Sequence, residues 1–205
     1  MNYAEKYKIV SEFEEKIADY AGSRYAVAVS SCTNALFLCC KYKRVDFVSI
    51  PKHTYVGVAC SIKHAGGRIL FINKKWKGIY TLAPHDIVDS ALRFRKGMYI
   101  KGSLYCLSFH WKKHLPIGRG GMILTDDKEA YDWLKRARFD GRDEIPLSKQ
   151  KDIKVCGYNM YLTPEQAEKG LELFRYRNEI QLSQDDLRIE DQHYPDLSKF
   201  TAFRK

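Results

Sequence analysis

The sequence of 205 residues has no apolar stretch long enough to span a membrane, no C-x-x-C pair, no internal repeat and no low-complexity tract. A chain without a long apolar stretch is not expected to cross a membrane as a helix. The first residues also lack the pattern of a secretory signal peptide. The six cysteines lie mostly in apolar runs without the paired spacing of zinc ligands, which is typical of reduced core residues. We therefore expect a cytoplasmic protein without a metal site.

The formal net charge of +10 favours anionic partners. The basic residues are dispersed, however, and the sequence has no helix-turn-helix, RNA-recognition signature or zinc finger. Nucleic acid is therefore not the partner that the sequence favours, and salt-dependent binding would test that expectation. A hydrophobic content of 45% at this length is sufficient for one domain with a sizeable core.

Short apolar strands alternate with helical patterns along most of the chain. Strands are predicted over residues 24–29, 46–50, 68–72, 87–89, 103–109 and 122–125. Helices are predicted over residues 3–21, 33–42, 54–64, 127–139, with Asp126 as its cap, and 163–180. Residues 73–86 are expected to be a loop with a tight turn, and residues 142–154 a polar, mobile loop. This alternation predicts an α/β fold with a mostly parallel sheet flanked by helices.

The last part of the chain differs in composition from the rest. We expect residues 1–180 to form one domain and residues 181–205 to be a polar tail. The tail could be a disordered end or an arm that docks on a partner.

Lys113 follows an apolar strand, and a glycine-rich turn at residues 118–121 comes soon after it. An amine at the end of a buried strand can form a Schiff base if its pKa is lowered. Ser108, five residues earlier, could bind an anion beside it. Taken alone, the pair Lys112 and Lys113 would be interpreted as a solvated surface pair, because lysine is mostly exposed. Three further segments favour a pyridoxal phosphate site instead.

In the first of these segments, a strand ends in small hydroxyl residues and a helix begins near Cys32 and Thr33, which can form an anion site. Many such turns only cap a helix. In the second, Asp89 ends an apolar strand and could keep a pyridine nitrogen protonated, although a satisfied core aspartate is the alternative. In the third, a capped helix begins at Thr163, and the loop before it exposes the amide of Asn159.

Ligands of a parallel α/β sheet bind at the carboxyl ends of its strands. Ser31, Asp89 and Ser108 all fall at such ends in the predicted pattern. We therefore expect these residues to share one pocket.

In their order and spacing, these segments resemble the DegT/DnrJ/EryC1/StrS family of sugar aminotransferases, which are fold type I pyridoxal phosphate enzymes. The resemblance extends from about residue 13 to about residue 173. It implies a truncated fold type I large domain, pyridoxal 5′-phosphate as the cofactor and amino transfer to a nucleotide-linked keto-sugar. The amino donor in this family is usually glutamate.

The resemblance also implies roles for the individual residues. Lys113 corresponds to the Schiff-base lysine, which also moves the proton during amino transfer. Asp89 corresponds to the partner of the pyridine nitrogen. Ser108 corresponds to a phosphate ligand, and the turn at Cys32 and Thr33 lies beside it.

Two further positions correspond to family residues around the cofactor. Tyr55 stands where the family has an aromatic ring that stacks on the cofactor. Asn159 resembles the amide that reaches the phosphate from a neighbouring subunit, which implies a homodimer with a shared active site.

The sequence departs from the family pattern in several ways. Leu92 stands where the family usually has glutamine or histidine, Cys32 replaces a common glycine, and Arg119 replaces a glutamate. Family members are also nearly twice as long, and this sequence has no counterpart of their small C-terminal domain after about Leu173.

These departures leave two alternatives to a minimal sugar aminotransferase. One is a related pyridoxal phosphate enzyme with other chemistry, such as a dehydratase, although such relatives replace the lysine with histidine. The other is a non-catalytic or split-enzyme protein that binds a partner or an anionic ligand.

Overall fold

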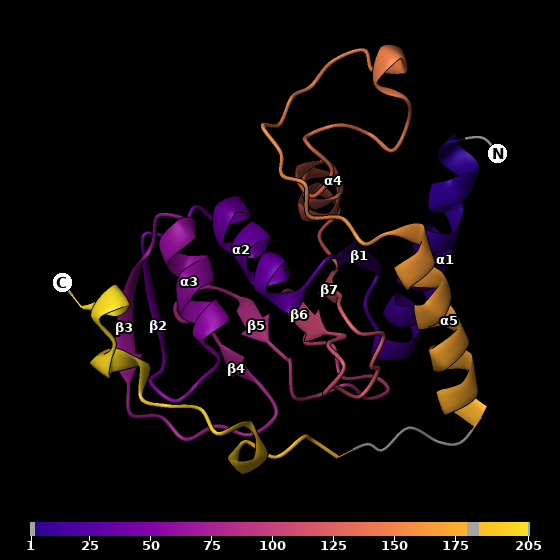
Figure 1. Cartoon of the computed structure of the whole chain (residues 1–205). Helices are drawn as coiled ribbons and strands as arrows, with labels where there is room; N and C mark the ends of the chain where they lie inside the picture. Colours follow the sequence, from indigo (N-terminus) through magenta and orange to yellow (C-terminus); the bar gives the residue numbers. More distant parts are fainter. Residues whose placement is uncertain (1–2, 180–184, 205) are drawn as a thin grey trace.

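The computed structural model describes residues 3–179 and 185–204 of the chain (Figure 1). The α-helices are α1 (Tyr3–Ala21), α2 (Cys32–Tyr42), α3 (Val56–His64), α4 (Lys128–Ala137) and α5 (Pro164–Glu179). The strands are β1 (Tyr25–Val29), β2 (Phe47–Pro51), β3 (Arg68–Ile72), β4 (Tyr80–Thr81), β5 (Ile87–Asp89), β6 (Leu104–Ser108) and β7 (Gly121–Thr125). Short 3-10 helices are η1 (Leu147–Lys149), η2 (Glu190–Gln192), η3 (Leu197–Lys199) and η4 (Thr201–Phe203).

The strands form a mixed sheet, which confirms the predicted α/β fold. Five strands pair in the order β1-β7-β6-β5-β4, and β2 pairs with β3 in parallel. An antiparallel bridge between Ser49 and Ala83 links the two groups of strands. β1, β5 and β6 run in one direction, whereas β7 and β4 run in the other. The reversals follow β6 and precede β5, where connections without a helix join antiparallel neighbours.

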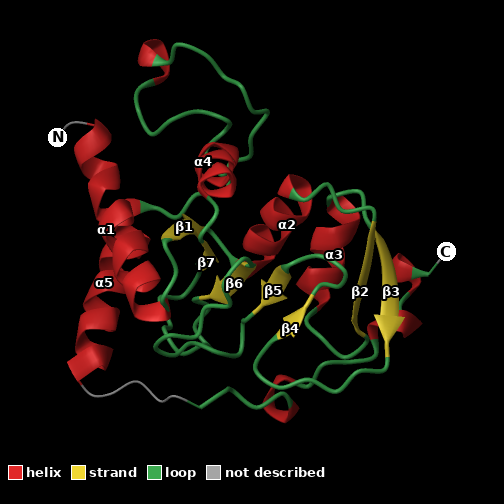
Figure 2. Cartoon of the chain, turned by 180° about the vertical axis from the view of Figure 1, so that it is seen from behind, coloured by secondary structure: helices red, strands yellow, loops and turns green. Residues whose placement is uncertain are grey.

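Each face of the sheet carries its own hydrophobic core. In β6, Leu104 and Cys106 pack with α2, α3 and α4, whereas Tyr105 and Leu107 pack with α1 and α5. Successive side chains of a strand point to opposite faces, so a buried strand supplies both cores at once. Helices therefore cover both sides of the sheet (Figure 2).

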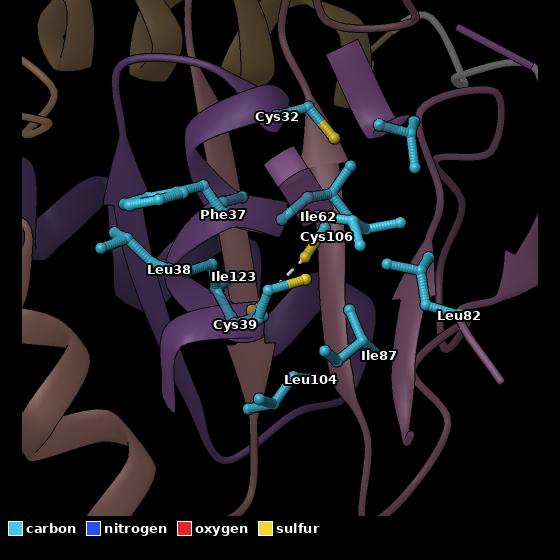
Figure 3. Packing of buried hydrophobic residues seen from close by; sticks show 14 of the residues in the cluster. Cys32, Phe37, Leu38, Cys39, Ile62, Leu82, Ile87, Leu104, Cys106 and Ile123 are labelled. Carbon is cyan, nitrogen blue, oxygen red and sulfur yellow. Dashed lines mark hydrogen bonds between the residues drawn. The ribbon is translucent and has the colours of Figure 1, made fainter. Parts of the chain in front are cut away.

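The core between α2 and β6 is closely packed. Leu38 and Cys39 of α2 are fully buried, and the Sγ atom of Cys39 lies 3.6 Å from that of Cys106 (Figure 3). The six cysteines are free thiols in the structure. Buried thiols of this kind pack as small apolar side chains.

The predicted cap of α4 is wrong. Asp127, not Asp126, is the N-cap, and its carboxylate accepts hydrogen bonds from the N–H groups of Glu129 and Ala130 at 2.8 and 3.2 Å. Asp126 instead accepts a hydrogen bond from the N–H of Arg24 at 2.8 Å. Two adjacent aspartates offer the same capping chemistry, and the contact with Arg24 decides between them.

The region predicted as a loop over residues 73–86 contains the strand β4. This strand has two residues and pairs with β5, so that Tyr80 lies opposite Asp89. An element of two residues is too short to produce a recognisable periodicity. The predicted end of the last long helix, at Ile180, lies outside the described residues. Within residues 3–179 and 185–204, none of the helices has the length and apolar character that a membrane crossing requires.

A buried ion cluster connects α1, β1 and α4. Arg138 is fully buried and donates hydrogen bonds to Glu14 and to the carbonyl oxygen of Ala28. Its Nη2 also lies 2.6 Å from Glu144 Oε1. Glu14 accepts a further hydrogen bond from Lys135 at 3.1 Å. A buried carboxylate that loses its main partner is only partly compensated by the contacts that remain, which is strongly destabilising.

We therefore expect Arg138→Ala to lower the free energy of unfolding by about 3–5 kcal/mol. Urea denaturation of the variant would measure this loss. Arg136→Ala is the matched control, because Arg136 pairs with Asp143 at the surface and such pairs contribute about 1 kcal/mol or less. Equal losses in the two variants would contradict the expected role of the buried cluster.

Candidate active site

A cavity of about 350 Å³ opens at the carboxyl ends of β1, β5 and β6. This volume is within the range of small-molecule and cofactor sites. Six of the seven residues that the sequence predicts for a cofactor site line this cavity: Cys32, Thr33, Tyr55, Asp89, Ser108 and Lys113. Elements far apart in the sequence thus meet at one edge of the sheet, where α/β proteins bind ligands.

The first turn of α2 forms one wall of the cavity. Ser31 is the N-cap, and its hydroxyl accepts a hydrogen bond from the N–H of Asn34 at 3.1 Å. Cys32 and Thr33 follow it at the cavity wall. The first N–H groups of a helix lack intrahelical acceptors, and the helix dipole favours negative charge beside them. This wall is therefore suited to bind an anion.

β7 passes directly against this turn. A Cβ atom on Gly121 would lie 2.5 Å from the carbonyl carbon of Ser31 and 2.6 Å from the nitrogen of Cys32. Real Cβ contacts are not this short, so another residue at position 121 would displace the turn. The glycine-rich segment after Lys113 thus shapes the anion-binding wall.

Tyr55 and Ser108 contribute side chains from two other elements. Tyr55 is the N-cap residue of α3, and its side chain is 55% exposed. A Cβ atom on Gly57 would lie 2.7 Å from the Tyr55 ring and 2.6 Å from Thr33 Oγ1. Glycine at position 57 therefore allows the ring and the hydroxyl to lie together at the wall. Ser108 ends β6 and is half-buried.

Asp89 is the last residue of β5 and is only 3% exposed. Its Oδ1 accepts a hydrogen bond from the N–H of Ala91 at 3.0 Å. Burial raises the pKa of Asp89, whereas the contacts with Ala91 and Tyr80 lower it. A buried carboxylate is costly unless it is paired, so a cationic ligand beside Asp89 would be stabilised.

Lys113 lies in the turn that follows β6, where its N–H donates to the carbonyl oxygen of His110 at 2.8 Å. Its side chain is partly buried, and Nζ donates a hydrogen bond to Gln192 Oε1 at 3.2 Å. Burial lowers the pKa of Lys113, whereas the negative charge of Asp89 raises it. A lowered pKa increases the fraction of neutral amine, which is the nucleophilic form.

The adjacent Lys112 has a different environment. It is exposed at the rim of the cavity, and its Nζ lies 4.8 Å from the centroid of the Trp111 ring. This distance allows a cation–π contact between Lys112 and the exposed ring, on the solvent side of the cavity. Geometry therefore favours Lys113 over Lys112 as the reactive amine.

Two of the positions compared with the family lie away from the cavity lining of the described chain. Asn159 is exposed, and its Nδ2 donates to Asp140 Oδ2 at 3.4 Å. Leu92 is fully buried, and its neighbour Ala91 reaches the cavity instead. The predicted role of Asn159 in a neighbouring subunit stays a prediction.

Trp76, Gln192 and Tyr194 also line the cavity, although sequence patterns did not indicate them as site residues. The rings of Trp76 and Tyr194 stack at a centroid distance of 6.3 Å and an interplanar angle of 15°. Burial raises the pKa of Tyr194, and the charge of Asp89 raises it further. Neither a motif nor a periodicity marks these three positions in the sequence. For Tyr194, the only signal is an aromatic side chain within a polar tail.

The family described as the DegT/DnrJ/EryC1/StrS aminotransferase family matches residues 2–93 and 95–187. Spore coat polysaccharide biosynthesis protein SpsC of Bacillus subtilis is 24% identical over 87% of this chain and 59% of its own length. A GDP-perosamine synthase of Escherichia coli O157:H7 is 28% identical over 79% of this chain and 56% of its own. The chain thus spans a little over half the length of these relatives.

Solved structures show the same fold. The aminotransferase PseC of Helicobacter pylori superposes with a TM-score of 0.70 and 18% identity, covering 83% of this chain and 58% of its own. DesV of S. venezuelae gives a TM-score of 0.70 and 20% identity over 83% and 57% of the two chains.

Proposed function

Because the chain belongs to the DegT/DnrJ/EryC1/StrS aminotransferase family, whose cofactor is pyridoxal 5′-phosphate, we propose that its cavity binds this cofactor for amino transfer. The proposed amino donor is L-glutamate, and the acceptor is a nucleotide-linked keto-sugar. The names of the relatives support a sugar acceptor, since one makes GDP-perosamine and another takes part in polysaccharide biosynthesis. The observation that carries the proposal is that Lys113, Asp89 and the first turn of α2 face one cavity.

The lining fits a flat ring that bears a phosphate and a basic nitrogen. Cys32 and Thr33 lie at a helix N-terminus, and the Ser108 hydroxyl lines the same cavity, so a phosphate can be held there. The buried carboxylate of Asp89 can pair with a protonated ring nitrogen. The exposed ring of Tyr55 at the wall can stack on the cofactor.

The cofactor supplies an electron sink for the amino donor when it is bound. Nζ of Lys113 would be the attachment point of the cofactor, and the amino donor would compete for the same cofactor carbon. The neutral Nζ of Lys113 would accept the Cα proton of the donor as a general base and would deliver it, as a general acid, to C4′ of the cofactor. The carboxylate of Asp89 would keep the ring nitrogen protonated during this transfer.

The proposal includes a homodimer. Asn159 is exposed and lies outside the cavity of its own chain, so it is free to reach the phosphate site of a second copy. Residues 1–180 would form the large domain of each subunit, and residues 181–205 an appended segment. A cytoplasmic location is part of the same proposal, because the free cysteines fit a reducing compartment.

The glutamate half-reaction tests this function. Addition of L-glutamate to the cofactor-loaded protein should remove the visible absorption band of the lysine-bound cofactor and release one 2-oxoglutarate per site. A nucleotide-linked keto-sugar should then restore the band, as ping-pong kinetics require.

D-glutamate is the control for stereospecific reaction in the cavity. A band that forms with the cofactor but does not respond to L-glutamate or another amino acid would contradict amino transfer. That result would favour a non-catalytic protein that binds the cofactor.

A further inference from the structure

Residues 185–204 cross the open side of the cavity and are fixed to the chain at both ends. At the first end, the guanidinium of Arg93 makes two hydrogen bonds to the carboxylate of Asp186, at 2.7 and 2.8 Å. The N–H of Leu187 donates to the carbonyl oxygen of Leu92 at 2.8 Å. Paired charge-assisted bonds of this kind fix orientation as well as position.

The second end is fixed by burial and by contacts with the segment after β2. Leu197 is fully buried in the core that α2 and α3 share. Its N–H donates to the carbonyl oxygen of Lys52 at 2.9 Å, and Lys52 Nζ lies 3.2 Å from Asp196 Oδ2. Figure 1 shows this segment in yellow, passing from below the sheet to the edge strand β3.

Between these two ends, Gln192 and Tyr194 lie at the cavity. The carbonyl oxygen of Tyr194 is 3.1 Å from His53 Nδ1, and its ring stacks on Trp76. Gln192 Oε1 is 3.2 Å from Lys113 Nζ. The segment therefore contacts the same amine that the proposed function makes reactive.

We propose that residues 185–204 form a wall of the active site and that Gln192 is a positioning residue for Lys113. Its effect on amino transfer rests on the proposed function, whereas the contact itself does not. When Gln192 accepts one N–H of Lys113, the lone pair of the neutral amine points away from Gln192, and Nζ is held at the cavity that both residues line. A long flexible side chain is thereby held in one orientation for reaction.

A neutral amide suits this role better than a carboxylate. A glutamate at position 192 would stabilise the ammonium form of Lys113 and reduce its nucleophilicity. The other charged or titratable groups that line the cavity are Cys32, Tyr55, Asp89, His110, Lys112, Arg119 and Tyr194. These groups are unchanged when only Gln192 is replaced, so its contribution can be isolated.

Labelling of Lys113 by acetic anhydride in the cofactor-free chain tests the proposal, with mass spectrometry of the Lys113 peptide across a pH series. Gln192→Glu should slow the labelling of Lys113 near neutral pH by about tenfold or more. Gln192→Leu removes an acceptor that favours the charged form, so labelling near neutral pH should become roughly threefold faster. At high pH, where the amine is neutral in every variant, the limiting rate should instead fall below that of the wild type, because the side chain is no longer held in one orientation. These opposite shifts of the pH profile are not expected from a general loosening of the fold.

Gln150→Glu and Gln150→Leu are matched controls, because Gln150 lies in the loop that carries η1 and does not line the cavity. They should leave the labelling of Lys113 unchanged. Wild-type profiles in both Gln192 variants, or shifts in the same direction, would overturn the positioning role. If the wild-type chain fails to take up the cofactor but the two Gln192 variants show opposite shifts, only the proposed function is refuted.

Discussion

Replacement of Lys113 with alanine is expected to slow amino transfer from glutamate by at least about a thousand-fold. The variant loses both the covalent attachment point of the cofactor and the base that accepts the Cα proton. The α2 turn and Ser108 remain, so the variant should still bind the cofactor. The single-turnover rate of the glutamate half-reaction, measured with saturating cofactor, separates lost chemistry from lost binding.

Lys112→Ala is the control for this variant. Lys112 is exposed and stacks on Trp111, so its loss should change the rate by no more than about twofold. If the Lys112 variant were slow and the Lys113 variant remained active, Lys112 and not Lys113 would be the reactive amine.

Asp89→Asn is expected to lower the rate of the same half-reaction by roughly a hundred-fold or more. An amide cannot hold the ring nitrogen in its protonated form, so the cofactor becomes a weaker electron sink. Burial raises the pKa of Asp89, which means that its charge is costly in the absence of a cationic partner. The amide should therefore not destabilise the fold, and thermal unfolding of the cofactor-free variant would check this.

The control for Asp89 is Asp46→Asn. Asp46 pairs with Arg68 at the surface, with a side chain that is 77% exposed. Its replacement should leave the half-reaction unchanged. If Asp89→Asn retained the wild-type rate, Asp89 could not be the partner of the ring nitrogen.

The parts of the fold that follow local rules could be predicted from the sequence. The structure confirms the predicted bounds of α1 (Tyr3–Ala21), β3 (Arg68–Ile72) and β5 (Ile87–Asp89). Apolar runs mark these elements in the sequence, and a glycine follows α1 and precedes β3. The sequence also predicted that Asp89 and Ser108 share one pocket, because the carboxyl ends of parallel strands meet at one edge of a sheet.

The parts that depend on long-range contacts could not be predicted. β4 exists because Tyr80 lies opposite Asp89, and its two residues carry no pattern of their own. Leu197 is buried against core residues that are remote in the sequence, and its N–H donates to the equally remote carbonyl oxygen of Lys52. For this reason a polar tail gave no indication that Gln192 faces the cavity.

The most direct test of the central claim is borohydride reduction of the protein with bound pyridoxal phosphate, followed by peptide mass spectrometry. The account predicts a single covalent adduct on Lys113, which is absent in Lys113→Ala and present in Lys112→Ala. An adduct on Lys112, or no adduct in a folded wild-type protein, would contradict the assignment of Lys113 and of this cavity as the cofactor site.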